Sequence, residues 1–158
     1  MKESLFVLCV LAVTVYLTVA AWEDYKTCEV TRWKHLIGGI PAICLLGMKY
    51  GQYSWQEYAM ILAFSLLFVL AGCLGAYGMA DGYVFMILTL LFGSMGGPAG
   101  VGIVILIMIT AGFSFLIHHL VKCMVKRKKI FCNMAAALIP HILIGYGIVW
   151  AGIFIYAA

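Results

Sequence analysis

Residues 58–121 read YAMILAFSLLFVLAGCLGAYGMADGYVFMILTLLFGSMGGPAGVGIVILIMITAGFSFLIHHLV, and this stretch decides the fold. Only one of its residues, Asp81, carries a formal charge. In the whole chain of 158 residues, 10% are charged and 66% are hydrophobic, whereas soluble domains carry about 25% charged residues. The sequence therefore excludes a soluble enzyme, a disordered protein and a nucleic-acid-binding module. It predicts an integral membrane protein surrounded by the lipid bilayer.

Apolar runs broken by charges or by glycine and proline turns predict about six crossings, at about 20 residues each. Lipid offers the backbone no hydrogen-bond partners, and the alternating pattern of a membrane barrel is missing, so we expect helices. The sequence thus predicts an all-α, polytopic membrane helical bundle that forms a single domain over residues 1–158. The expected spans are Ser4–Trp22, Leu36–Tyr50, Glu57–Gly75, Gly82–Met95, Pro98–Val121 and Met134–Ala157.

The first apolar run also resembles a cleavable signal peptide, because it ends in the small residues Val19, Ala20 and Ala21. We prefer a retained first span. The segments downstream are also membrane-embedded, and Lys2 is offset by Glu3, which weakens the positive start of a signal peptide.

Basic residues set the expected orientation. With six alternating spans, eight of the ten basic residues share one side. By the positive-inside rule that side is cytoplasmic, so the chain is expected to be a multi-pass protein of the cytoplasmic membrane with both termini outside. The eight are Lys26, Arg32, Lys34, Lys122, Lys126, Arg127, Lys128 and Lys129, against Lys2 and Lys49.

Asp81 is the first candidate functional residue, because an acid among apolar helices is costly and is a functional candidate by default. A plainer explanation is that it caps a helix starting at Gly82. The expected topology brings Asp24, at the end of the first span, to the same face and depth. Two poorly hydrated carboxyls cannot both ionise easily, so one holds a proton while the other acts as a base, as in an aspartic protease.

Asp24 is followed by a basic loop, Gly78-Met79-Ala80-Asp81 leads into the fourth span, and Ile139-Pro140 lies near the start of the last span. In these motifs and in the number of its spans, the chain resembles the prepilin and preflagellin peptidases, which are GxGD-type membrane aspartic proteases. It departs from the family at Ala80, where many members have glycine, and in lacking Ile-Pro-Asn after Asp24.

The resemblance implies Asp24 and Asp81 as the catalytic pair, with Gly78 allowing close backbone approach. It implies cleavage of short basic leaders from type IV pilin-like precursors at the cytoplasmic face, without a metal or another cofactor. The larger bifunctional members carry a cytosolic region with paired Cys-x-x-Cys motifs. No such motif is present here, so methyltransferase activity is not expected.

Two other functions remain open. One is a small transporter or channel subunit in which Asp81 binds a proton or cation, and the other is an inactive scaffold for pilus assembly. His141, one turn inside the last span, could tune the acid pair or simply bond a neighbouring helix. His118 and His119 point about 100° apart on a helix, which makes them poor ligands for one metal ion.

Overall fold

The computed structural model describes residues 2–126 and 137–157. Within these residues the chain forms six helices and no strand, as predicted. The helices are α1 (Lys2–Thr27), α2 (Lys34–Met48), α3 (Trp55–Cys73), α4 (Met79–Gly96), α5 (Pro98–Lys126) and α6 (Ile139–Ala157). Residues 127–129 of the expected basic cluster, Cys132, and the first three residues of the expected last span lie outside the described residues.

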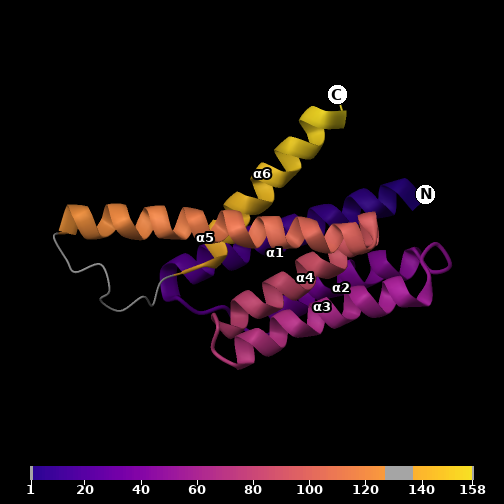
Figure 1. The fold of residues 1–158 in the computed structure, drawn as a ribbon, viewed down its shortest axis with the longest axis horizontal. Coiled ribbons are helices and arrows are strands. Elements are labelled where there is room, and N and C mark those ends of the chain that lie inside the picture. The colour runs from indigo at the N-terminus through magenta and orange to yellow at the C-terminus, as the bar shows by residue number, and fades with distance from the viewer. Residues whose placement is uncertain (1, 127–136, 158) are drawn as a thin grey trace.

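Helix α4 is the central helix of the bundle. It packs against α2, α3 and α5, while α1 packs against α2 and α6, and α6 returns to α5 (Figure 1). Five helices therefore form a closed ring, and α3 covers the outside of α4. Inside the protein, 67% of the α4 span is buried, against 33% or less for every other candidate span.

Five helices are long and apolar enough to cross a membrane, and α2 is the short one. Its 15 residues rise about 22 Å, which is less than the hydrocarbon thickness of about 30 Å. The sequence had instead predicted a short fourth span. That prediction was wrong, because α4 begins three residues earlier than expected and includes Asp81.

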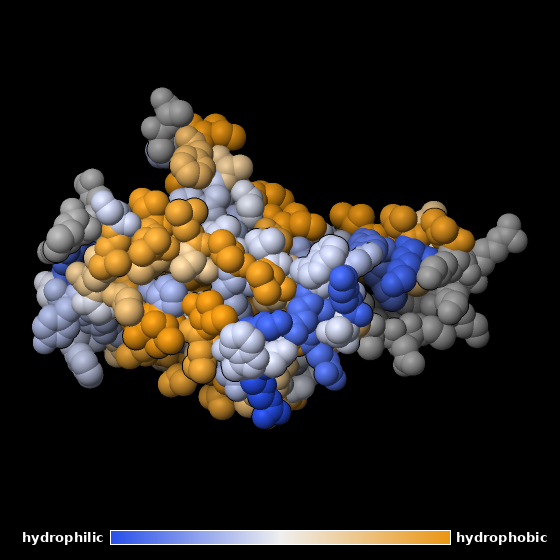
Figure 2. All heavy atoms as spheres, turned by 180° about the vertical axis from the view of Figure 1, so that it is seen from behind, coloured by the Kyte–Doolittle hydropathy of each residue, from blue (hydrophilic) through white to orange (hydrophobic). Residues whose placement is uncertain are grey.

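The outer surface of the bundle is apolar. Leu8, Leu66 and Ile117 are among many large hydrophobic side chains that are more than half exposed, and apolar residues cover much of the face in Figure 2. In water such a surface would promote aggregation, whereas in a bilayer it contacts lipid tails. The chain is therefore a multi-pass membrane protein.

The two turns at one end of the bundle are tied together. The N–H of Gly97, at the α4–α5 turn, donates to the Tyr53 hydroxyl over 3.1 Å, and that hydroxyl donates to the Ser94 carbonyl over 3.1 Å. Gly97 has a φ of 59°, a conformation in which glycine avoids steric strain. A few residues on, a Cβ at Gly100 would collide with the Phe92 carbonyl, so glycine lets the backbones of α4 and α5 touch. The glycines around Pro98 thus allow both a tight turn and close packing of the two helices.

Candidate active site

Asp24 lies in the last turn of α1 and is 6% exposed. The sequence had placed it just after the first span. The helix runs on to Thr27, because the charged residues that end an apolar run do not break a helix. Asp24 therefore has the fixed backbone of a helix rather than that of a loop.

The Asp24 carboxyl holds the beginning of α6. Its Oδ2 accepts a hydrogen bond from the Ile139 N–H over 3.0 Å, in a buried position. The first N–H groups of a helix have no partner within the helix, so an acid here satisfies one of them. A carboxylate at this end also favourably meets the positive end of the α6 dipole. Asp24 thus connects the end of α1 to the beginning of α6.

Asp81 is the third residue of α4 and is 8% exposed. Asp81 caps this helix, as the plainer explanation held, but the helix begins at Met79 rather than at Gly82. Asp81 Oδ2 accepts a hydrogen bond from the N–H of Gly78, the residue that precedes the helix, over 3.1 Å. Asp81 therefore turns back onto the residues that lead into its own helix.

Gly78 leaves room for this arrangement. A Cβ built on Gly78 would lie 2.9 Å from Asp81 Oδ2, closer than Cβ atoms approach other atoms. The sequence predicted that Gly78 lets the backbone come close to another group. The structure identifies that group as the Asp81 carboxyl itself.

Asp24 and Asp81 lie at the same end of the bundle, where α1 ends and α4 begins (Figure 1). The two carboxyls are close enough for their charges to act on each other. Each is buried, each comes from a different helix, and each accepts a hydrogen bond from a backbone N–H. Such a pair can share one proton and exchange roles as acid and base.

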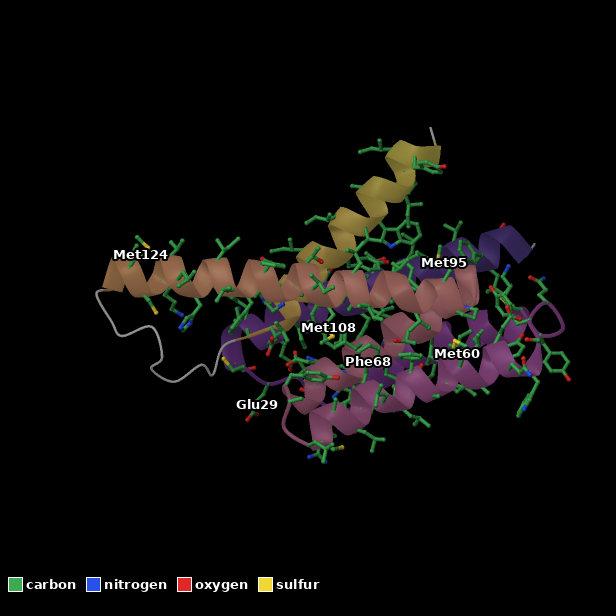
Figure 3. All side chains as sticks on the ribbon, viewed as in Figure 1. Glu29, Met60, Phe68, Met95, Met108 and Met124 are labelled. Carbon is green, nitrogen blue, oxygen red and sulfur yellow. The ribbon has the colours of Figure 1, made fainter. Side chains whose placement is uncertain are left out.

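The turn between α3 and α4 lies at the same end of the bundle as the two acids and is fixed by a hydrogen bond. The Tyr77 hydroxyl donates to the Phe68 carbonyl over 2.7 Å. Burial, and secondly the Asp81 carboxyl, raise the pKa of Tyr77, so the phenol stays a neutral hydrogen-bond donor. A Cβ on Gly82 would lie 3.0 Å from the same Phe68 carbonyl, which shows how closely α3 and α4 pack here. Figure 3 labels Phe68 at this packing contact.

A buried histidine of α2, His35, contacts both α1 and α4. The Tyr16 hydroxyl and His35 Nδ1 form a hydrogen bond of 2.6 Å, and the His35 ring lies 5.0 Å from that of Tyr83. Tyr83 follows Asp81 by two residues on α4. This group could not be predicted, because nothing in the sequence pairs Tyr16 with His35.

His141 joins α6 to α5 rather than acting alone. Its Nδ1 is 2.8 Å from Ser114 Oγ, and its Nε2 is 3.3 Å from His118 Nδ1. His119 instead approaches Cys123 over 3.5 Å, which confirms that the neighbouring histidines point apart. Of the two explanations offered for His141, the structure favours a bond to a neighbouring helix.

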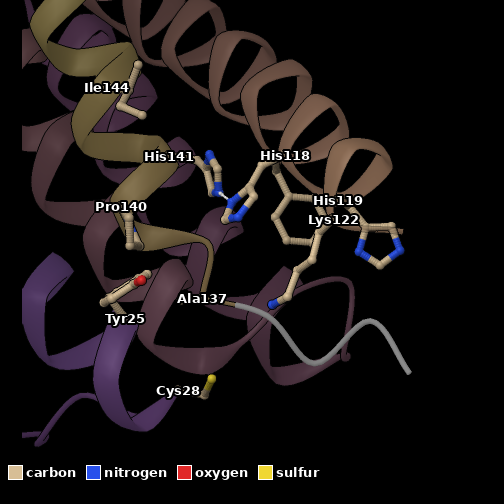
Figure 4. Close-up of a pocket in the computed structure, with 10 residues that line it drawn as sticks. Tyr25, Cys28, His118, His119, Lys122, Ala137, Pro140, His141 and Ile144 are labelled. Carbon is tan, nitrogen blue, oxygen red and sulfur yellow. Dashed lines mark hydrogen bonds between the residues drawn. The ribbon is translucent and has the colours of Figure 1, made fainter. Parts of the chain in front are cut away.

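A pocket of about 290 Å³ opens beside this histidine pair (Figure 4). It is formed by α1, α5 and α6, and Lys122 reaches into it toward Ala137. The lining residues are Tyr25, Cys28, Phe115, His118, His119, Lys122, Ala137, Pro140, His141 and Ile144. No acidic residue is among them.

No group of three His, Cys, Asp or Glu side chains within residues 2–126 and 137–157 is arranged to hold a metal ion. Comparison of the chain with protein families, with curated proteins and with solved structures gives no match.

Proposed function

We propose that this protein is a membrane aspartic endopeptidase in which Asp24 and Asp81 form the catalytic pair. The observation that supports the proposal is that two buried carboxyls, from the end of α1 and the beginning of α4, lie at one end of a membrane bundle, near enough to interact electrostatically. Acids are rare in membrane proteins unless they serve a function, and a pair that shares one environment is the arrangement used for acid–base hydrolysis.

In the proposed reaction, the ionised carboxyl takes a proton from a water molecule as that water attacks the peptide carbonyl carbon. The protonated carboxyl donates its proton to the carbonyl oxygen. Collapse of the tetrahedral intermediate then breaks the C–N bond: the second carboxyl takes back a proton from a diol hydroxyl as the new carbonyl forms, and the proton held by the first acid passes to the leaving amine. One water is consumed, and the pair returns to its shared-proton state.

The resemblance supports type IV pilin-like precursors as substrates. The leader would be cut on the cytoplasmic face, the side that carries most of the basic residues. Glu23 is not needed to bind a basic leader, because it already pairs with Lys34 over 2.8 Å and accepts from Thr31 over 2.8 Å. Methyltransferase activity is not part of the proposal.

A second candidate function is a non-catalytic scaffold. It is favoured by the structural role of both acids, because Asp24 accepts a hydrogen bond from the first residue of α6 and Asp81 accepts one from Gly78. A transporter that uses Asp81 alone leaves the pairing with Asp24 unexplained.

The deciding experiment is co-expression with a tagged pilin-like precursor, with leader removal followed by its mobility shift. Asp24→Asn and Asp81→Asn are the informative variants, because the amide oxygen can still accept the backbone N–H while the acid is lost. Both variants should insert into the membrane and lose cleavage by several orders of magnitude. The control is Glu29→Gln, which changes an exposed acid near the same end of the bundle (Figure 3). This variant should cleave the precursor as the wild type does.

Cleavage that persists in either Asn variant removes the aspartic mechanism. If the wild type itself leaves the precursors uncut while the Asn variants insert and assemble normally, the scaffold is favoured. Proton uptake into proteoliposomes that depends on Asp81 and is unaffected by Asp24→Asn would favour the transporter.

A further inference from the structure

Within residues 2–126 and 137–157, the only fully charged side chain that lines the pocket between α1, α5 and α6 is the basic residue Lys122. Lys122 contributes a fixed charge, and it has no ion-pair partner among the described residues. His118 and His141 add imidazole groups, and no acidic side chain lines the pocket. The pocket is therefore suited to an anion and unsuited to a basic peptide.

The pocket lies at the level of a membrane surface. Helix α5 begins at Pro98, and His118 follows 20 residues later. At about 1.5 Å per residue the helix has then risen about 30 Å, the thickness of the hydrocarbon layer. Lys122 lies one turn further on, where phospholipid phosphates are found.

An apolar groove of about 510 Å³ adjoins the pocket. Tyr25 and Pro140 line both spaces, so the two are continuous. From Tyr25 the groove follows α1 toward the membrane interior, reaching Thr18 about 10 Å deeper. Its remaining lining consists of Val19, Ala21, Trp22 and Leu143.

A second positive charge lies near the groove. The Lys26 ammonium lies over the Trp22 ring, 4.4 Å from its centre. The combined surface thus has a positive charge at the pocket, from Lys122, a second one beside the groove, from Lys26, and an apolar lining along the groove itself. A ligand that fits this surface has a negative head and a hydrocarbon tail.

We propose that this surface binds one anionic phospholipid, with its phosphate at Lys122 and the histidines and an acyl chain in the α1–α6 groove. The phosphate finds donors and positive charge, and the chain covers apolar side chains that helix packing leaves open. The site is separate from the acid pair and does not depend on the proposed peptidase activity. Bound there, the lipid holds α6 against α1 and α5.

The test measures lipids retained by the purified protein by native mass spectrometry. Phosphatidylglycerol and phosphatidylcholine with the same acyl chains are supplied in equal amounts, and glycerol phosphate is supplied separately. Lys122→Gln removes the fixed charge, and Lys49→Gln at the opposite end is its control. Val19→Trp fills the groove, and Val15→Trp, one turn away on α1 and outside the groove lining, is its control.

Wild type and both controls should retain phosphatidylglycerol in preference to phosphatidylcholine. Lys122→Gln should reduce this preference about five-fold, and Val19→Trp should reduce retention of both lipids. Equal retention of the two lipids by the wild type overturns the proposal, as does a Lys122→Gln variant that behaves like the wild type. Glycerol phosphate that competes as well as the whole lipid would show an anion site without a chain groove, which also overturns it.

Discussion

The N–H of Ile139 donates a hydrogen bond to Asp24 Oδ2 across 3.0 Å, joining the last helix to the end of the first. These residues are 115 positions apart in the chain. A proposed catalytic acid therefore also holds the helix that closes the ring. Tests of catalysis must separate the acid from the hydrogen-bond acceptor.

Asp24→Ala should destabilise the protein by about 1–3 kcal/mol, because it leaves the buried Ile139 N–H without a partner. Asp24→Asn should recover most of that loss, because its amide oxygen can accept the same bond. Thermal unfolding in detergent measures both. Equal stability of Asp24→Ala and wild type would show that the Ile139 bond contributes nothing to the fold.

Gly78→Ala should impair catalysis more than stability. Its φ of −66° suits alanine, but the new Cβ would lie 2.9 Å from Asp81 Oδ2 and displace the carboxyl. A displacement of about 1 Å in a reacting group can cost about 100-fold in rate. Gly39→Ala is the matched control, since nothing lies within 4 Å of its Cβ position. The pair is compared by precursor cleavage and by unfolding temperature, and equal cleavage by both variants would contradict the expectation.

Hydropathy predicted the number of helices but not their ends. Hydropathy shows where a run of apolar side chains ends, whereas a helix ends where the hydrogen bonds between its backbone N–H and carbonyl groups end. Helix α1 therefore extends beyond Trp22 to Thr27, and α4 begins at Met79 rather than Gly82. These extensions bring Asp24 and Asp81 into helices and fix their direction. Their identities as candidates followed from their charge, from the expected topology and from the family resemblance.

Contacts between helices that are distant in the chain could not be predicted from sequence patterns. The His118–His141 contact depends on how α5 and α6 rotate against each other, and the Tyr16–His35 bond depends on the packing of α1 on α2. Neither rotation is encoded in a local motif. The sequence could show only that these polar groups face protein rather than lipid.

Gly100→Ala should disrupt the contact between α4 and α5. Its Cβ would collide with the Phe92 carbonyl, and a backbone atom cannot move aside as a side chain can. We expect a loss of about 3 kcal/mol or more, at the upper end of overpacking costs. Gly102→Ala, two residues along the same helix with open space at its Cβ, should be neutral or slightly stabilising. Gel filtration and thermal unfolding compare them, and two variants of equal stability would refute the predicted close approach.

Tyr16→Phe should cost about 1–3 kcal/mol, because it leaves the buried His35 Nδ1 without its 2.6 Å partner. Tyr50→Phe, at a side chain that is 89% exposed, should leave the unfolding temperature unchanged. A double variant that also carries His35→Phe should lose less than the sum of the single changes, since both partners of the bond are then apolar. Strict additivity would show that the two side chains are not energetically coupled.

The proposed orientation can be tested with single cysteines in a cysteine-free background. Cys28 is exposed at the acid-pair end, and Gln52 is exposed at the opposite end, near the Tyr53–Gly97 contact. By the positive-inside rule, a membrane-impermeant maleimide should label Gln52→Cys in intact cells and Cys28 only after permeabilisation. The reverse pattern would place Asp24 and Asp81 outside, where a cytoplasmic leader peptide could not reach them. Orientation therefore bears directly on the substrate, because a peptidase can cut only the side of a precursor that reaches its acid pair.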